Sequence, residues 1–204
     1  MLIGKWNKSV ILSYIGLFFG VFGIYYAVVT KNIKYAMICL ILSGICDMFD
    51  GTVARKCKRT EEEKEFGIQL DSLNDVFNFT ALPIAIFIGM GLTEIYQIAI
   101  FCVYAMFGIA RLANFNIRTA STKTKNKYYE GLPVTTVAVI FPVFYLLSLV
   151  LEKAVFNYVY TALILIVGFL FVLNIKVKKP SIKFSIGLAI FGIIATLLYL
   201  FVIW

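Results

Sequence analysis

The sequence has no histidine and few charged residues of either sign. Of its 204 residues only 15% are charged, whereas 61% are hydrophobic, and the mean hydropathy is +0.91. This composition is too apolar for a soluble domain of that length. The lack of histidine excludes a histidine base, a histidine metal ligand and a phosphohistidine intermediate. Any chemistry must therefore be carried out by carboxylates, hydroxyls and cations.

Features of an additional soluble domain are also lacking. The connections between apolar stretches are short, and we find no internal repeat, low-complexity tract or linker. The four cysteines, Cys39, Cys46, Cys57 and Cys102, have no CxxC spacing and are interpreted as free thiols. We therefore expect one membrane domain covering residues 1–204.

Seven apolar stretches dominate the chain. Each is close to the ~20 residues that cross the hydrocarbon layer of a bilayer as a helix. Because the apolar runs are continuous rather than alternating, they exclude a β-barrel. The predicted fold is all-α, a polytopic membrane bundle of about seven transmembrane helices: Ser9–Val29, Tyr35–Val53, Phe66–Met90, Ile95–Ile117, Leu132–Leu151, Ala154–Asn174 and Phe184–Ile203.

The net charge of +8 is explained by membrane orientation rather than by nucleic-acid binding. With the first residues in the cytoplasm and alternating sides, every lysine and arginine except Lys31, Lys34 and Lys153 falls on the cytoplasmic side. The positive-inside rule favours this orientation. We expect a multi-pass protein of the cell membrane and no nucleic-acid partner.

Four aspartates interrupt the second and third stretches. Asp47 and Asp50 are three residues apart, and Asp71 and Asp75 are four apart, so each pair projects from one helix face. The connection between the two stretches, with Glu61, Glu62, Glu63 and Glu65, is interpreted as a solvated turn. An antiparallel helix pair would bring the four aspartates together near one membrane surface.

A cluster of carboxylates in an apolar setting needs a counter-charge, because charge within a membrane is expensive and usually functional. Oxygen ligands alone favour a hard divalent cation such as Mg²⁺ or Mn²⁺. Four carboxylates can hold two ions, an arrangement that clamps both oxygens of a phosphoryl displacement. Gly51 and Gly67 leave room for a ligand to approach the helix backbones.

This motif resembles the signature of the CDP-alcohol phosphotransferase family. The matching positions run in one order, with eleven residues between the arginine and the second glycine: Asp47, Asp50, Gly51, Ala54, Arg55, Gly67, Asp71 and Asp75. The resemblance implies transfer of a phosphatidyl group from a CDP-linked lipid, usually CDP-diacylglycerol, to the hydroxyl of a small alcohol, with release of CMP. It also implies a homodimer.

The resemblance assigns roles to the motif residues. Asp47, Asp50 and Asp71 would bind divalent metal at the pyrophosphate, and Asp75 would bind metal and act as the base that deprotonates the acceptor hydroxyl. The CDP head would be contacted by Asp50, Gly51, Ala54, Arg55, Gly67 and Asp71.

Two further segments, ARLANFNIR (residues 110–118) and YYEGLPVTT (residues 128–136), are similar to membrane-type phosphatidylserine synthases. L-serine is therefore the expected acceptor. Arg111 or Arg118 would meet its carboxylate or a phosphate with a planar guanidinium. Glu130, or carbonyls near Gly131, would meet its ammonium group. Glycerol-3-phosphate or inositol phosphate are alternative acceptors, and the tail of the lipid can be ester-linked or ether-linked.

Two other classes of membrane protein are alternatives to an enzyme. An ion-coupled transporter would spread its acidic groups across the membrane depth, whereas these aspartates gather near one side. A purely structural membrane protein would leave the aspartate cluster unexplained. The sequence therefore favours a membrane-embedded transferase.

Overall fold

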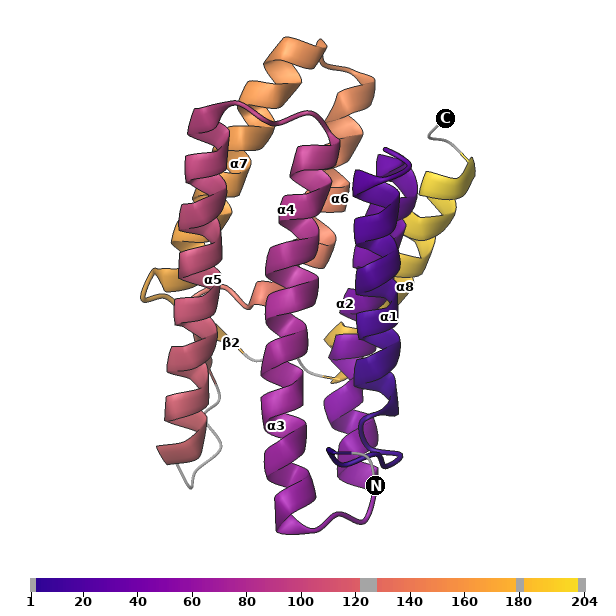
Figure 1. The fold of residues 1–204 in the computed structure, drawn as a ribbon, viewed down its shortest axis with the longest axis vertical. Coiled ribbons are helices and arrows are strands. Elements are labelled where there is room, and N and C mark those ends of the chain that lie inside the picture. The colour runs from indigo at the N-terminus through magenta and orange to yellow at the C-terminus, as the bar shows by residue number, and fades with distance from the viewer. Residues whose placement is uncertain (1–2, 122–127, 179–181, 202–204) are drawn as a thin grey trace.

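The computed structural model describes residues 3–121, 128–178 and 182–201, which form an elongated bundle of helices (Figure 1). Within these residues, five helices are long and apolar enough to cross a membrane, and two shorter apolar helices accompany them. The predicted all-α membrane bundle is confirmed. Its one addition is a small two-stranded sheet, which the sequence did not predict.

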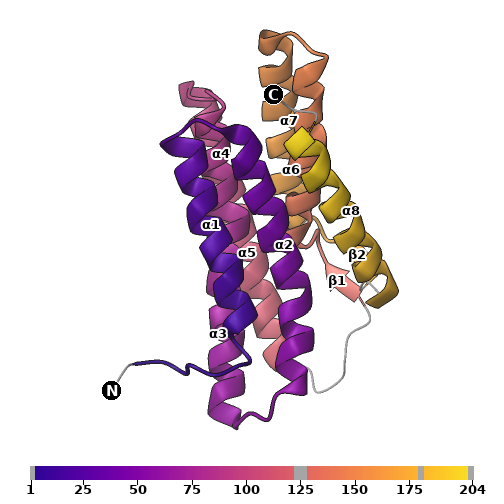
Figure 2. The same ribbon diagram turned by 90° about the vertical axis from the view of Figure 1, so that its right-hand side faces the viewer.

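Helices α1 (Ile11–Val28) and α2 (Ile33–Lys56) form an antiparallel pair, as Figure 2 shows. The Asn32 side chain caps α2 by accepting a hydrogen bond from the Tyr35 amide. Three glycines of α1, Gly16, Gly20 and Gly23, are buried against its neighbours. A Cβ on Gly20 would lie 2.0 Å from Asn78 Oδ1, so α1 approaches the third helix more closely than alanine would permit.

The third membrane helix is continuous from Glu61 to Gly89 but changes its winding midway. It consists of α3 (Glu61–Val76), a π-helical turn η1 (Phe77–Ala81) and α4 (Leu82–Gly89), with Pro83 at the start of α4. Pro83 has no N–H to offer the carbonyl four residues earlier, that of Phe79. The buried Tyr104 hydroxyl donates to that carbonyl instead, at 2.6 Å.

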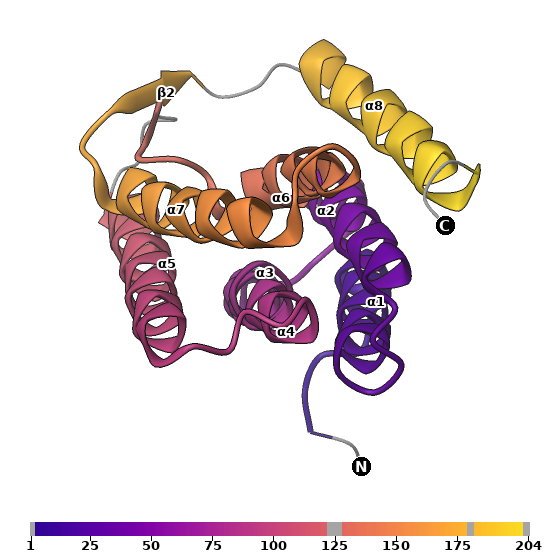
Figure 3. The ribbon, with the colours of Figure 1, turned by 90° about the horizontal axis from the view of Figure 1, so that it is seen from above.

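Four helices follow α4: α5 (Ile95–Ser121), α6 (Val137–Tyr145), α7 (Lys153–Val172) and α8 (Ile182–Phe201). The last of them, α8, lies outside α2, away from α3 and α4 (Figure 3). Short 3₁₀ turns, η2 (Val134–Thr136) and η3 (Leu146–Leu149), flank α6. The predicted helix over 132–151 is therefore α-helical only in its middle, around Pro142.

A two-stranded antiparallel sheet joins the segment after α5 to the segment after α7. Strand β1 (Tyr128–Glu130) pairs with β2 (Lys176–Lys178), and Glu130 stands opposite Lys176. The pairing fixes the position of Glu130 relative to the end of α7.

The predicted turn over Glu61–Glu65 is wrong, because these residues form the first turns of α3, although Glu61, Glu62 and Glu65 are exposed as expected. Thr60 and Glu63 make a capping box: the Thr60 hydroxyl accepts from the Glu63 amide, and Glu63 Oε2 accepts from the Thr60 amide at 2.8 Å. The turn between α2 and α3 is therefore shorter than expected. The short turn limits how the two aspartate-bearing helices can be placed relative to each other.

The aromatic core lies away from the charged end of the bundle. Phe87 of α4 packs edge-on against Phe141 of α6, with ring centroids 4.9 Å apart, and Tyr104 and Tyr160 lie beside them. All four side chains are almost completely buried. These four side chains come from α4, α5, α6 and α7, whereas the aspartates belong to the last turns of α2 and to α3.

Candidate active site

Two neighbouring helices carry the four aspartates. Asp47 and Asp50 lie in the last three turns of α2, and Asp71 and Asp75 lie in the second half of α3. Since α2 runs into α3 through the short turn at 57–60, the two helices are antiparallel neighbours. The aspartates of one helix therefore face those of the other.

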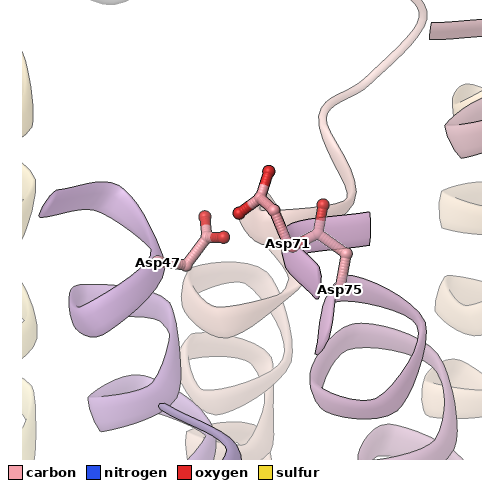
Figure 4. Close-up of side chains that lie close together, drawn as sticks. All are labelled: Asp47, Asp71 and Asp75. Carbon is pink, nitrogen blue, oxygen red and sulfur yellow. The ribbon is translucent and has the colours of Figure 1, made fainter. Parts of the chain in front are cut away.

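Three of the four carboxylates meet in one group. One oxygen each from Asp47, Asp71 and Asp75 lies within 4.8 Å of the others, and Figure 4 shows the side chains pointing toward one another from α2 and α3. Asp75 is only 9% exposed, and its Oδ1 is buried with no hydrogen-bond partner among the described residues. Such a set of oxygens fits a hard divalent cation.

Asp50 stands beside this group rather than within it. Its side chain is 8% exposed, and its Oδ2 accepts a hydrogen bond from the Ser13 hydroxyl of α1 at 2.9 Å. The carboxyl is still close enough to Asp71 to interact with it. The expected convergence of the four aspartates thus takes the form of three in close contact and a fourth at the edge.

The two motif glycines border open space. A Cβ on Gly51 would meet only Arg55 Nη1, at 3.4 Å, and a Cβ on Gly67 would meet only Arg59 Nη1, at 3.7 Å. Arg55 itself donates to the Thr52 hydroxyl at 2.8 Å. Ala54, half-buried on α2, belongs to the same end of the helix. Both arginines lie beside positions where a phosphate group could approach the helix backbone. Arg59 is not among the site residues that the sequence predicts.

Arg111 of α5 reaches the aspartates from the other side. It is 8% exposed, and its charge acts on Asp75. Its guanidinium carbon also lies 5.2 Å from the centroid of the Phe115 ring, a cation–π contact. A second link between the helices comes from Asn116, whose amide donates to the Ser72 hydroxyl at 2.8 Å. Helix α5 is therefore tied to α3 at the level of the cluster.

Arg118 and Glu130, the other two charged residues predicted at the acceptor site, form an ion pair with each other. Gly131 follows with a positive φ of 73°, and a Cβ there would lie 2.2 Å from the Phe171 carbonyl oxygen. Its amide donates to the Ile175 carbonyl at 2.9 Å. Gly131 thus has a packing reason to be glycine, independent of any acceptor.

Ser13 and Asn74 are site residues that the sequence analysis missed. Asn74, next to Asp75, donates to the Ser13 carbonyl at 3.0 Å. Neither residue belongs to a recognisable motif. The only available signal was the position of Asn74 within the aspartate-bearing stretch.

Comparison with known proteins agrees with this geometry. The model of the family described as CDP-alcohol phosphatidyltransferase matches residues 6–190. The chain is 39% identical to the CDP-diacylglycerol–serine O-phosphatidyltransferase of Saccharomyces cerevisiae over 102 residues, which is 47% of this chain and 36% of the relative.

Two further relatives differ in the product that their names give. The archaetidylserine synthase of Methanothermobacter thermautotrophicus is 35% identical over 117 residues, 56% of this chain and 48% of the relative. The phosphatidylcholine synthase of Borreliella burgdorferi is 32% identical over 120 residues, 58% of this chain and 49% of the relative. The chain spans about half the length of these relatives, or less.

Proposed function

This chain belongs to the CDP-alcohol phosphatidyltransferase family, and we propose that it transfers a phosphatidyl group from CDP-diacylglycerol, or from an ether-linked CDP-lipid, to the hydroxyl of L-serine, releasing CMP. The proposal rests on the close approach of the Asp47, Asp71 and Asp75 carboxylates, which lie within the residues that the family model matches. Relatives named for serine-containing products support serine as the acceptor.

The aspartates would hold two divalent ions, Mg²⁺ or Mn²⁺. Asp47, Asp71 and Asp75 offer oxygens within 4.8 Å of one another, and Asp50 lies at the edge of this group. When bound, such ions neutralise the pyrophosphate and the charge that develops on its oxygens. The buried Oδ1 of Asp75, with no hydrogen-bond partner in the described part of the chain, fits a group that awaits a cation or a proton.

The open space beside Gly51 and Gly67 suits the CDP head. Arg55 lies at one glycine, and Arg59 lies at the other. Guanidinium groups bind phosphate oxygens through paired N–H donors. We assign the nucleotide and its diphosphate to this space, together with Ala54, Asp50 and Asp71.

Asp75 is the proposed general base. The serine hydroxyl oxygen forms a bond to the phosphorus of the transferred group, the bond from that phosphorus to the CMP oxygen breaks, and Asp75 takes the hydroxyl proton. Arg111 lies near Asp75 and can hold the acceptor or a phosphate oxygen there. The outer part of the acceptor site would be formed by Arg118, Glu130 and Gly131. On binding of serine, Arg118 would pair with its carboxylate and Glu130 with its ammonium group, in place of each other.

The protein is a multi-pass membrane protein by its helices and its family. We further propose that the aspartates face the cytoplasm of the cell membrane, because the sequence assigns every lysine and arginine except Lys31, Lys34 and Lys153 to the cytoplasmic side. We also propose that residues 1–204 act as one domain and that the protein is a homodimer, as the family resemblance implies. Cross-linking in native membranes tests the dimer.

An acceptor panel tests the proposed function. Purified protein in detergent receives CDP-diacylglycerol, Mn²⁺ and either L-serine, choline, glycerol-3-phosphate or inositol phosphate, and CMP release is measured. We expect release with serine only. Release with a different alcohol would correct the acceptor and keep the family chemistry, whereas no release with any acceptor, for ester-linked and ether-linked donors alike, would overturn the proposed reaction.

A further inference from the structure

Ser13 makes two hydrogen bonds to the helices that carry the aspartates. Its hydroxyl donates to Asp50 Oδ2 at 2.9 Å, and its carbonyl accepts from Asn74 Nδ2 at 3.0 Å. Asp50 belongs to α2 and Asn74 to α3. One residue of α1 therefore joins both helices at the level of the aspartate group.

The glycines of α1 explain how Ser13 can lie so close to α2 and α3. A Cβ on Gly16 would lie 3.3 Å from Cys46 Cβ, and one on Gly20 would lie 2.0 Å from Asn78 Oδ1. Helix α1 is thus seated against both α2 and α3. It carries no charged residue, and Ser13 offers Asp50 a neutral hydrogen-bond donor.

A neutral donor is what a metal-binding carboxylate at this position needs. Repulsion from the neighbouring aspartates acts to move the Asp50 carboxylate, and the Ser13 hydroxyl opposes this together with the Gly51 amide and the charge of Arg55. A lysine or arginine would hold it but would also compete with a divalent ion for its charge. The Ser13 hydroxyl binds Oδ2 without adding charge.

We propose that Ser13 is a positioning residue, held in place by Asn74, that orients Asp50 as a ligand of the divalent metal. The inference rests on the metal-binding part of the proposed function. Removal of a group that hydrogen-bonds to a metal ligand typically lowers metal affinity or activity by roughly 10–100-fold. Ser13 acts on the metal through Asp50, so its loss should weaken metal binding and leave the affinity for serine unchanged.

Manganese binding to the purified full-length protein in detergent tests the inference directly. Free Mn²⁺ is followed by electron paramagnetic resonance during a titration, with no substrate present. Ser13→Ala should weaken Mn²⁺ binding by about tenfold, and Ser13→Thr, which keeps the hydroxyl, should restore most of the affinity. The KM for serine should stay at the wild-type value in both variants.

Ser43→Ala is the matched control. Ser43 is a buried serine of α2 whose hydroxyl donates to the Leu40 carbonyl of its own helix at 2.9 Å. Its removal deletes a buried hydroxyl without touching an aspartate, so Mn²⁺ binding should match the wild type. If Ser13→Ala fails to fold, Ser13→Cys takes its place, because a thiol of similar size is a weak donor.

The outcomes separate the two proposals. Wild-type protein that binds Mn²⁺, with equal binding by the Ser13 variants, would overturn the positioning role and leave the metal site intact. Wild-type protein that binds no Mn²⁺ would overturn both. Weakened binding in Ser13→Ala, with rescue by threonine and no change in Ser43→Ala, supports Ser13 as the residue that orients Asp50.

Discussion

Arg118, in the last turn of α5, forms an ion pair with Glu130 of β1. The two side chains come from segments on either side of the 122–127 connection and are partly exposed. Serine carries a carboxylate, which can take the place of Glu130 beside Arg118. It also carries an ammonium group, which can take the place of Arg118 beside Glu130. The pair thus offers a zwitterion two matched charges at once.

Arg118→Ala is therefore expected to raise the KM for serine more than the KM for the CDP-lipid. A hydrogen bond to a charged group is worth roughly 1.5 kcal/mol at the low end, which corresponds to about tenfold in KM. Glu130→Ala should have a similar effect through the ammonium group. Steady-state kinetics with each substrate varied in turn measure both constants.

The control for this pair is Lys5→Ala. Lys5 forms an ion pair with Glu62 at 2.9 Å, and both side chains are exposed, so it deletes a charge without touching the acceptor segments. It should leave both KM values unchanged. An unchanged serine KM in Arg118→Ala, or an equal rise for the CDP-lipid, would remove the pair from the acceptor site.

The aspartate group should be essential for turnover. Asp47→Asn and Asp71→Asn each remove a charge from the set of three that meets within 4.8 Å. Activity should fall to background in both variants, disappear with a chelator and return with Mg²⁺ or Mn²⁺. Glu61→Gln, at the exposed start of α3, is the control and should behave like the wild type. Full activity in chelator would contradict a metal-dependent reaction.

The sequence predicted that the aspartates of the two helices come together, because local spacing determines it, and three of them do. The intervals from Asp47 to Asp50 and from Asp71 to Asp75 fix one face on each helix, and a short turn makes the two helices antiparallel. The capping box at Thr60 and Glu63 was also visible as a T-x-x-E pattern before an apolar run. The charge of the segment favours a solvated turn instead, and the structure shows that a helix begins there.

The partners of the aspartates could not be predicted in the same way. Helix α1 is apolar on all sides, so its sequence does not fix which face turns toward α2 and α3. Only the packed structure brings Ser13 to Asp50. The β1–β2 pairing is similarly long-range: each strand has three residues, too few for an alternating pattern to be recognised.

Gly20→Ala is expected to destabilise the bundle. The new Cβ would lie 2.0 Å from Asn78 Oδ1 and 3.1 Å from the Phe77 ring, so these side chains, or α1 itself, must shift. Overpacking of this kind typically costs about 1–3 kcal/mol. Thermal unfolding in detergent, followed by circular dichroism, should show a lower Tm.

Gly187→Ala supplies the matched control, since a Cβ at this exposed position of α8 meets nothing within 4 Å. Alanine favours a helix over glycine by about 0.8–1.0 kcal/mol. The Tm of Gly187→Ala should thus equal or exceed that of the wild type. If both variants melt like the wild type, α1 does not need its close contact with the third helix.

Asp75 should act as the base of a single displacement. A serine hydroxyl is a poor nucleophile at neutral pH, and the sequence offers no histidine to take its proton. Asp75→Asn should therefore lose more than ~100-fold in turnover, the low end for removal of a general base. Because Asp75 also belongs to the three-carboxylate group, turnover must be measured at saturating Mn²⁺, where a weaker metal site no longer limits the rate. CDP-lipid binding should be retained.

The stereochemistry at phosphorus distinguishes this route from a covalent one. Direct attack by serine inverts the configuration at the transferred phosphorus. If a carboxylate attacks first and serine attacks second, the two displacements together retain the configuration. With divalent ions bound, the aspartates would be poor nucleophiles, because the ions would neutralise their charge. We expect inversion with a donor made chiral at the transferred phosphorus. Retention, or a lipid covalently attached to the protein after denaturation, would replace the base role of Asp75 with a nucleophilic carboxylate.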